Sequence, residues 1–302
     1  METTTTRPAL PPRQARPPAS PPAKPPITQV SFAPIAENLG QRTVIFGPGG
    51  IGKTTLACTA PGPVAFFDLD GSLPILKPKL KTRDVRVVPG ITEWQYLRDT
   101  LNAPGWDAVK TIVIDTATRA EELCVAYTLA TVPHEKGHKV SKIEEYGYGK
   151  GYRHNYDNFL ALLADLDQHY LAGRNVILIC HDCVCNVANP LGDDYVRWEP
   201  RLQNQNNGNI RARVREWADH VLFIVYDLNI RKSKDDKSAK ASGGGTRTIY
   251  PTEQPHCMAK SRTLAEPLEL GNPWTLGHYD TAIWDALFGG PAAQEAKDAT
   301  QS

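Results

Sequence analysis

The most constraining feature of the chain is residues 47–54, which read GPGGIGKT and fit the pattern glycine, any four residues, glycine, lysine, then serine or threonine. This pattern is typical of loops that hold nucleotide phosphates, because the glycines let successive backbone N–H groups converge on one phosphate. The octapeptide follows the β-branched run 42–46 and precedes residues 54–58, which can open a helix. The sequence therefore predicts a phosphate-binding loop in an α/β fold. The alternative is a glycine-rich turn that fits the pattern by chance.

Each residue of this loop has an expected role. Lys53 would reach the β- and γ-phosphate oxygens, and the hydroxyl of Thr54 would bind the Mg²⁺ ion that bridges these oxygens. The N-terminus of the following helix adds partial positive charge. We therefore predict that the loop binds a nucleotide together with Mg²⁺. The predicted nucleotide-binding residues are Gly47, Pro48, Gly49, Gly50, Ile51, Gly52, Lys53, Thr54 and Thr55.

Apolar β-branched runs recur between helical patterns, which is the signature of a mainly parallel sheet flanked by helices. Aromatic and leucine residues at three- and four-residue spacing from Tyr152 to Tyr170 predict one helix of about twenty residues. Residues 229–232 and 246–250 bracket a lysine- and glycine-rich connection and predict a C-terminal antiparallel hairpin extension. One more strand is expected at 256–260. The other expected strands are 42–46, 63–67, 85–88, 111–114, 175–179 and 220–226.

Composition divides the 302 residues into a central domain, predicted over 28–290, and two ends whose composition does not favour a folded core. Residues 1–27 are dense in proline and lack apolar periodicity, which predicts a disordered arm, either a passive tail or a recognition motif. Residues 291–302 are predicted to be a disordered tail. The net charge of +1 excludes a polycation that coats DNA by bulk charge, although residues 201–247 carry ten basic against five acidic residues. No long apolar run or export signal is present, so we expect a cytoplasmic protein without membrane contact.

Three of the six cysteines cluster in the sequence CHDCVC at residues 180–185. Cys180, Cys183 and Cys185 resemble a metal cluster, but no second paired ligand set at zinc-like spacing accompanies them. We expect free thiols, with zinc binding as the alternative.

Phosphoryl transfer to water needs a metal ligand, a group that orients the water and positive charge at the γ-phosphate. Asp115 ends the apolar run 111–114, and a carboxylate at the carboxyl edge of a parallel strand faces the phosphate loop, where it can hold Mg²⁺. The alternative for Asp115 is a helix N-cap.

Two further strand ends carry polar side chains. Asp70, with Asp68 in support, follows the run 63–67 and is predicted to orient the attacking water, the alternative being an acidic turn. His181 follows the run 175–179, where it could sense the γ-phosphate by hydrogen bonding or serve as a structural histidine.

Together these motifs resemble the RecA-like ATPases of bacteriophages, especially the Sak-type single-strand annealing proteins, described as phage nucleotide-binding AAA-type proteins. The resemblance runs from about Gln41 to Leu270 and implies a RecA-like P-loop NTPase domain located in the host cytoplasm if phage-encoded. It implies that Mg-ATP is bound by the phosphate loop with Asp115. Asp70 takes the position of an acidic residue that is usually glutamate, and its shorter reach implies slow hydrolysis. The motifs that carry the resemblance are GPGGIGKT, FFDLDGS, TIVIDTAT, YGYGKGY, VILICHD and MAKSRTLAEPLEL.

RecA-like proteins also place two cations, one residue apart in a late strand, on ATP bound by the neighbouring subunit. Lys260 and Arg262 have that spacing, so the resemblance implies a homo-oligomer with ATP at its subunit interfaces. Alternate residues of a strand share a face, which would let both side chains point across an interface. The alternative is a solvated pair that protects an edge strand from aggregation.

The resemblance implies DNA-stimulated ATP hydrolysis, single-stranded DNA binding, and annealing or strand pairing in phage recombination, with a single-strand DNA-binding protein as a candidate partner. Arg211, Arg213, Arg215 and the stretch Lys232 to Lys240 could form a basic groove for the DNA backbone. The motif YGYGKGY has no derived role, although Lys150 and Arg153 could meet phosphate. Alternatives are an ATP-driven motor or switch that acts on a protein, such as a helicase loader, and a small-molecule kinase.

Overall fold

The computed structural model describes residues 30–36, 39–80, 83–232, 239–243, 245–271 and 281–288. The chain divides into two units, Met1–Glu37 and Asn38–Ser302, and every helix and strand below belongs to the second unit. The predicted arm 1–27 and tail 291–302 lie outside the described residues.

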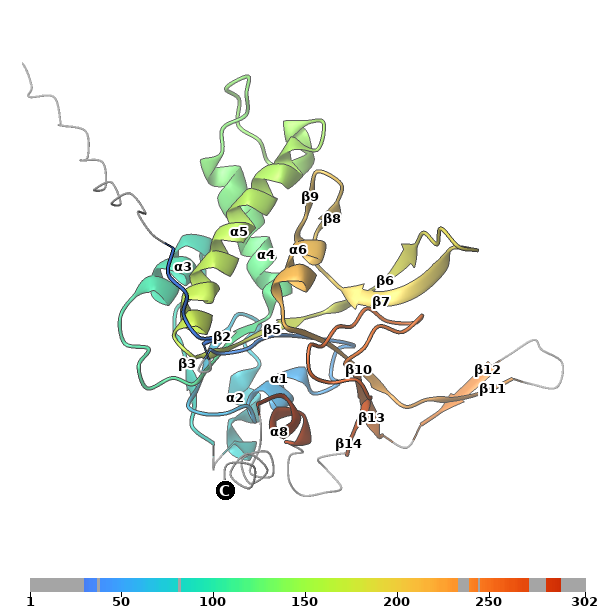
Figure 1. Ribbon diagram of the computed structural model, residues 1–302. Helices are drawn as coiled ribbons and strands as arrows, with labels where there is room; N and C mark the ends of the chain where they lie inside the picture. The colour runs from blue at the N-terminus through green and yellow to red at the C-terminus, as the bar shows by residue number, and fades with distance from the viewer. Residues whose placement is uncertain are drawn as a thin grey trace, which may run out of the picture. The chain divides into compact units, whose positions relative to one another are not determined.

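One central sheet organises the second unit, and eight strands of the described residues form it (Figure 1). Six neighbouring strands, from β10 to β3, run parallel, and the last two, β13 and β14, run antiparallel. The predicted α/β fold, with a mainly parallel sheet and antiparallel C-terminal strands, is thus confirmed. In spatial order the strands are β14 (Leu268–Leu270), β13 (Arg247–Tyr250), β10 (His220–Tyr226), β1 (Arg42–Phe46), β5 (Asn175–Cys180), β4 (Thr111–Asp115), β2 (Val64–Asp68) and β3 (Val85–Val87).

Helices cover both faces of the sheet, and this explains why its central strands are apolar along nearly their whole length. One face packs against a large cluster that includes Trp94 and Phe159, and the other packs against a cluster that includes Leu56 and Trp284. The helices of the first face are α3 (Trp94–Asn102), α4 (Ala117–Thr131), α5 (Lys150–Leu171) and α6 (Ile210–Trp217). Those of the second are α1 (Lys53–Ala57), α2 (Leu73–Leu76) and α8 (Ala282–Phe288), and the short helix η1 (Lys77–Lys79) follows α2.

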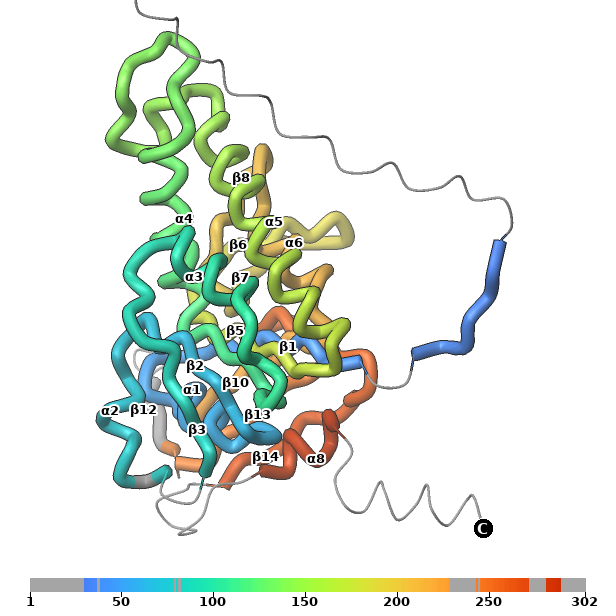
Figure 2. Tube along the Cα trace, turned by 90° about the vertical axis from the view of Figure 1, so that its left-hand side faces the viewer, coloured from blue at the N-terminus to red at the C-terminus, as the bar shows by residue number. Residues whose placement is uncertain are grey.

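The long helix predicted from the aromatic spacing is α5, and it runs beside α4 beyond the sheet (Figures 1 and 2). The connection between these two helices contains the short helix η2 (Ile143–Tyr146). We call residues 133–149, together with the first turn of α5, the tip. Two short hairpins follow β5 before α6. They pair β6 (Asp182–Val187) with β7 (Tyr195–Pro200), and β8 (Asn204–Gln205) with β9 (Gly208–Asn209).

The pairing predicted for the C-terminal extension is wrong. The strand β11 (Asn229–Lys232) pairs with β12 (Ala239–Ser242), inside the stretch expected to be a connection. The strand β13 instead pairs with β10 in the central sheet, because its Ile249 is fully buried in the core there. The apolar side chain of Ile249 favours the central sheet over the more polar strand Asn229–Lys232.

The strand expected at 256–260 is also wrong. Cys257 makes isolated bridges to Trp198 and Gln254, and Lys260 makes one to Val221. The segment crosses from the β6–β7 hairpin to β10, so it cannot follow either neighbour for long enough to form a ladder.

Candidate functional site

The phosphate loop joins the carboxyl end of β1 to the N-terminus of α1, as predicted. Gly47 has φ 153°, and a Cβ atom there would lie 2.2 Å from the carbonyl oxygen of Ile224. Gly52 precedes α1 in the left-handed region, with φ 99°. Both positions therefore require glycine, the first because β10 approaches closely and the second because of its backbone conformation.

Lys53 points back into the loop. Its ammonium donates to the carbonyl oxygens of Gly47 at 2.6 Å and Pro48 at 2.9 Å, and only 7% of the residue is exposed. Burial lowers the pKa of Lys53, while the carboxylates of Asp182 and Asp115 act to raise it. A buried ammonium of this kind favours an anion, because an opposite charge offsets the cost of desolvation.

Asp115 lies beside the loop at the end of β4. Its carboxylate accepts a hydrogen bond of 2.7 Å from the hydroxyl of Thr54, and a second, longer one of 3.4 Å from Ser72. Burial raises the pKa of Asp115 to about 6, and the nearby Asp70 and Asp68 act in the same direction. The N-cap of α4 is Thr116, whose hydroxyl accepts a hydrogen bond from the backbone N–H of Arg119. The alternative that Asp115 caps this helix is therefore wrong.

The side chains at the loop fit a magnesium nucleotide. The Thr54 hydroxyl and the Asp115 carboxylate are adjacent oxygen ligands of the kind that Mg²⁺ prefers. Lys53 supplies the buried positive charge that phosphate oxygens require.

The other two predicted strand-end groups meet at the same edge of the sheet. The Nε2 atom of His181 lies 3.4 Å from the carboxylate of Asp70, and both side chains are about one third exposed. The carboxylate of Asp68 instead accepts the backbone N–H groups of Ser72 and Leu73, and so caps the N-terminus of α2. Asp70 is therefore the carboxylate of this turn that faces the site, whereas Asp68 has a structural role.

Lys260 and Arg262 lie at the opposite, amino end of the sheet. The ammonium of Lys260 donates to three carbonyl oxygens near the end of α6, including that of Ala218 at 2.6 Å. Arg262 pairs with Asp219 at 3.0 Å, and Asp219 in turn binds Arg42, the first residue of β1. The length of β1, about 13 Å, therefore separates both cations from the phosphate loop of their own chain.

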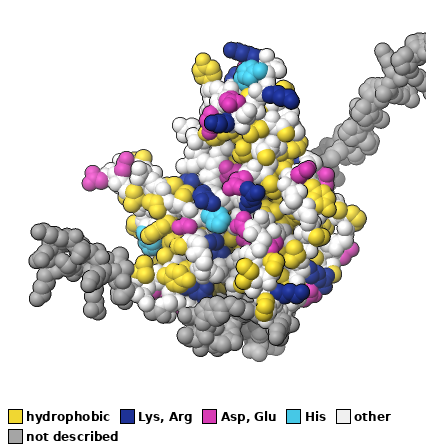
Figure 3. Space-filling view, turned by 180° about the vertical axis from the view of Figure 1, so that it is seen from behind, with side chains coloured by type: hydrophobic (Ala, Val, Ile, Leu, Met, Phe, Trp, Pro, Cys, Tyr) yellow, Lys and Arg dark blue, Asp and Glu magenta, His cyan; other side chains and the backbone are white. Residues whose placement is uncertain are grey.

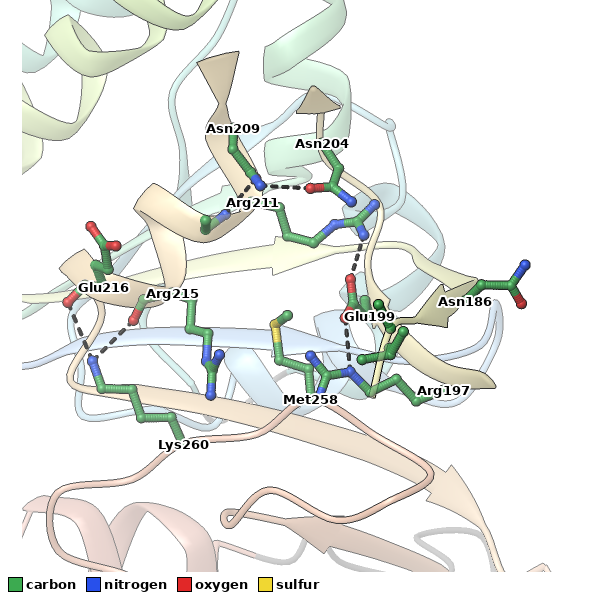
Figure 4. Close-up of a pocket in the computed structure, with 13 residues that line it drawn as sticks. Asn186, Arg197, Glu199, Asn204, Asn209, Arg211, Arg215, Glu216, Met258 and Lys260 are labelled. Carbon is green, nitrogen blue, oxygen red and sulfur yellow. Dashed lines mark hydrogen bonds and ion pairs between the residues drawn. The ribbon is translucent and has the colours of Figure 1, made fainter. Parts of the chain in front are cut away.

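A pocket of about 580 Å³ lies between α6, the β6–β7 hairpin and the segment that ends at Lys260 (Figure 4). Arg211 in its wall is buried and ion-paired with Glu199, which also binds Arg197. Arg211 is therefore not available to a DNA backbone, and its assignment to the predicted groove is wrong. Arg213 and Arg215 pair with Glu216 and Glu253. The stretch Lys232 to Lys240 lies partly outside the described residues.

Arg211 also contacts two of the clustered cysteines. Its guanidinium donates to the sulfur of Cys185 at 3.1 Å and to that of Cys183 at 3.4 Å, whereas Cys180 is buried at the end of β5. Burial raises the pKa of Cys183 to about 11. Within the part of the chain that the structure describes, no group of three or more histidine, cysteine or acidic side chains is arranged to hold a metal ion.

Sequence reasoning missed three residues of the site. Asp182 lies near Lys53 and follows β5 closely, so the strand-end rule that selected Asp115 could have found it. Ser72 contacts Asp115 from a turn whose course the sequence does not reveal. Arg247 reaches the phosphate loop from β13, and only the sheet pairing shows this.

Comparison with known proteins gives one family match. Residues 39–263 match the family AAA_24, described as an AAA domain, and the chain belongs to this family. The family match and the phosphate loop together indicate a P-loop ATPase of AAA type. No curated protein matches the sequence. A solved KaiC-like protein from the hyperthermophilic archaeon Pyrococcus horikoshii is 12% identical over 77% of this chain and 86% of that chain. The TM-score between the two structures is 0.39.

No helix among the described residues is long and apolar enough to cross a membrane.

Proposed function

We propose that this protein is a RecA-like ATPase that binds single-stranded DNA and promotes annealing or strand pairing in phage recombination, with ATP binding as the switch for assembly. The observation that carries the DNA part is Tyr148, in the middle of the motif YGYGKGY. Its side chain is 95% exposed, and its φ of 50° makes it the only non-glycine residue with positive φ among those described. Gly147 and Gly149 flank it, both with φ 72°.

An aromatic ring held out into solvent at such a turn suits base stacking, which is tolerant of sequence. The turn lies in a basic environment, because residues 133–154 contain five lysine or arginine residues against three glutamates. Figure 3 shows lysine and arginine side chains, with a histidine, at the upper end of the lobe that the tip forms. Positive charge at this position would attract the phosphate backbone of a nucleic acid.

An amide-rich turn supports the tip from the side. The side chain of Asn207, in the turn between β8 and β9, donates to the carbonyl oxygen of Tyr148 at 2.9 Å. Residues 203–209 read QNQNNGN, and the side chains of Asn204 to Asn207 are exposed. Exposed amides can donate to and accept from base edges, so the two turns together offer stacking, positive charge and hydrogen bonding.

Hydrogen bonds, joined by the backbone from Arg201 to Gln203, lead from the nucleotide site toward the tip. The hydroxyl of Thr118 binds both the N–H of His181 and the carbonyl oxygen of Arg201, and the N–H of Arg201 returns to the carbonyl oxygen of His181. Gln203 then donates to the carbonyl oxygen of Tyr152 in the first turn of α5. These contacts support a role for His181 in passing the nucleotide state to the DNA-binding turns.

At the nucleotide site we assign these roles to the chain. Lys53 turns from its carbonyl partners to the phosphate oxygens, and Thr54 with Asp115 holds the metal. Asp70, positioned by His181, accepts a hydrogen bond from the attacking water and so orients it. When bound, Mg²⁺ supplies charge neutralisation at the β- and γ-phosphates.

Negative charge develops on the γ-phosphate oxygens during the transfer, and cations from a neighbouring subunit can stabilise it in addition to Lys53. Lys260 and Arg262 lie together at the amino end of the sheet, where Arg262 is 60% exposed. A neighbouring subunit that stacks this end on the phosphate loop would bring both cations to ATP. We therefore propose a homo-oligomer with ATP at its interfaces.

The test of the proposed function is ATP turnover with and without oligothymidine, together with binding of labelled oligothymidine in Mg-ATP. Stacking of one base contributes about 1–3 kcal/mol, so Tyr148→Ala should weaken binding by about 5- to 150-fold. Tyr148→Phe keeps the ring and should bind as the wild type does. The matched control is Tyr96→Ala, since Tyr96 is a half-exposed tyrosine on α3, away from the tip.

Equal loss of binding in the alanine variants of Tyr148 and Tyr96 would contradict the assignment of the tip. Wild-type turnover that is indifferent to oligothymidine, with no binding at low salt, would contradict DNA binding altogether. That result would favour the alternative of an ATP-driven switch acting on a protein partner.

A further inference from the structure

Arg247 enters the nucleotide site from the antiparallel extension. It is the first residue of β13, where it pairs across the sheet with Tyr226 of β10 and with Leu270 of β14. The phosphate loop leaves β1 next to β10, so the start of β13 lies one strand beyond the loop.

The guanidinium of Arg247 is packed against the backbone of the loop. Its Nη1 atom donates to the carbonyl oxygen of Ile51 at 2.7 Å, and its Nη2 atom donates to that of Gly271 at 2.9 Å. A Cβ atom at Gly52 would lie 2.6 Å from Nη1. The phosphate loop and the end of β14 are therefore held by one planar cation, a geometry that lysine cannot reproduce.

The contact with Ile51 has a consequence for the next residue. In a planar trans peptide the C=O and the N–H point in opposite directions. Arg247 holds the carbonyl oxygen of Ile51 toward the extension, so the N–H of Gly52 in the same peptide must point the other way, into the loop. Backbone N–H groups of such loops are the donors that cradle the phosphates.

We propose that Arg247 is a positioning residue for nucleotide binding, which orients the Gly52 N–H toward the phosphates by fixing the Ile51–Gly52 peptide. It acts through the loop backbone and does not touch the reacting atoms. The inference rests on nucleotide binding at the loop and does not depend on DNA.

The geometry also predicts which nucleotides are affected. The loop N–H groups bind phosphates that ATP and ADP share, whereas the proposed trans cations meet the γ-phosphate, which only ATP has. Loss of Arg247 should therefore weaken the binding of ATP and the binding of ADP by the same factor. A purely structural tie between the extension and the domain would lower thermal stability and leave both affinities unchanged.

The experiment measures dissociation constants for Mg-ATP and Mg-ADP by titration calorimetry on the full chain. For Arg247→Ala we expect both constants to rise about tenfold, and for Arg247→Lys, which keeps the charge and one donor, a smaller equal rise. The matched control is Arg174→Ala. Arg174 holds the carbonyl oxygen of Trp106 at 2.9 Å at the amino end of β5, and its loss should change neither constant.

The outcomes separate this inference from the proposed function. If the wild type binds neither nucleotide, both fail. If the wild type binds and Arg247→Ala folds and binds equally well, only the positioning role fails. If Arg247→Ala is unfolded, Arg247→Lys decides: a folded lysine variant with wild-type constants overturns the proposal, and equal weakening of both nucleotides supports it.

Discussion

Glu121 on α4 is a partly buried carboxyl group whose ionisation opposes folding. Burial raises its pKa from the usual 4.5 to about 7, although the N–H of Gln203 donates to it at 2.9 Å and the charge of Arg211 also favours its ionised form. Replacement by glutamine keeps an oxygen that can accept from Gln203 and removes the charge. Glu121→Gln should therefore stabilise the protein, and only at a pH where the wild-type residue is ionised.

The magnitude follows from the pKa. Because the folded-state pKa lies above the unfolded one, the group's stabilising contribution is complete below about pH 4.5 and is lost as the pH rises through about 7. The full loss amounts to about 3 kcal/mol, at 1.36 kcal/mol for each pH unit between the two pKa values. About 2 kcal/mol of it falls between pH 5.5 and pH 8.5.

Urea unfolding of the wild type and of Glu121→Gln at these two pH values measures the effect. We expect the stability difference in favour of the variant to grow by about 2 kcal/mol from the lower to the higher pH. Asp115 has the same sign of pH dependence but is present in both proteins, so the difference isolates Glu121. The control is Glu122→Gln, an exposed neighbour on the same helix. A difference for Glu121→Gln that is independent of pH, or equal to that of the control, would refute the reasoning.

Two further predictions concern catalysis. Lys53→Ala removes the buried ammonium of the phosphate loop and should abolish ATP binding or turnover, measured by calorimetry and phosphate release; a folded variant that retains both would overturn the site assignment. Mixing Arg262→Ala subunits with Lys53→Ala subunits should partly restore turnover, since each supplies across an interface what the other lacks. A mixture whose activity is only the sum of its two components would count against a cation acting in trans.

Much of the fold could be predicted because five of the six parallel strands are buried along most of their length, and the sixth, β3, is a short edge strand that is still rich in valine. Each of them appears in the sequence as a short apolar run, and the six predicted positions coincide with β1, β2, β3, β4, β5 and β10 within one or two residues. The helix α5 was predictable for a related reason, since its one buried face repeats at the period of an α-helix. Where burial is one-sided or partial, as at the extension, the local pattern did not determine the pairing partner.

Some residues of the site could likewise be predicted from sequence and others could not. Lys53, Thr54, Asp115, Asp70 and His181 could be proposed from sequence because the carboxyl ends of parallel strands meet at one edge. The same rule gave Asp68 a supporting role at the site, and only the structure shows that its carboxylate caps α2. Arg211 was misassigned because a basic residue looks the same in sequence whether it faces solvent or a buried glutamate.

The sequence by itself determined the phosphate loop, since glycines at fixed spacing, a lysine and a threonine are the chemistry that phosphates require. Only the tertiary structure decided which cations lie close to that loop and which lie far from it. Arg247 comes to it from a strand nearly two hundred residues away, and Lys260 and Arg262 lie at the far end of the sheet. These placements depend on strand pairing over long sequence separation, which is set by how the whole core is buried and not by any local pattern.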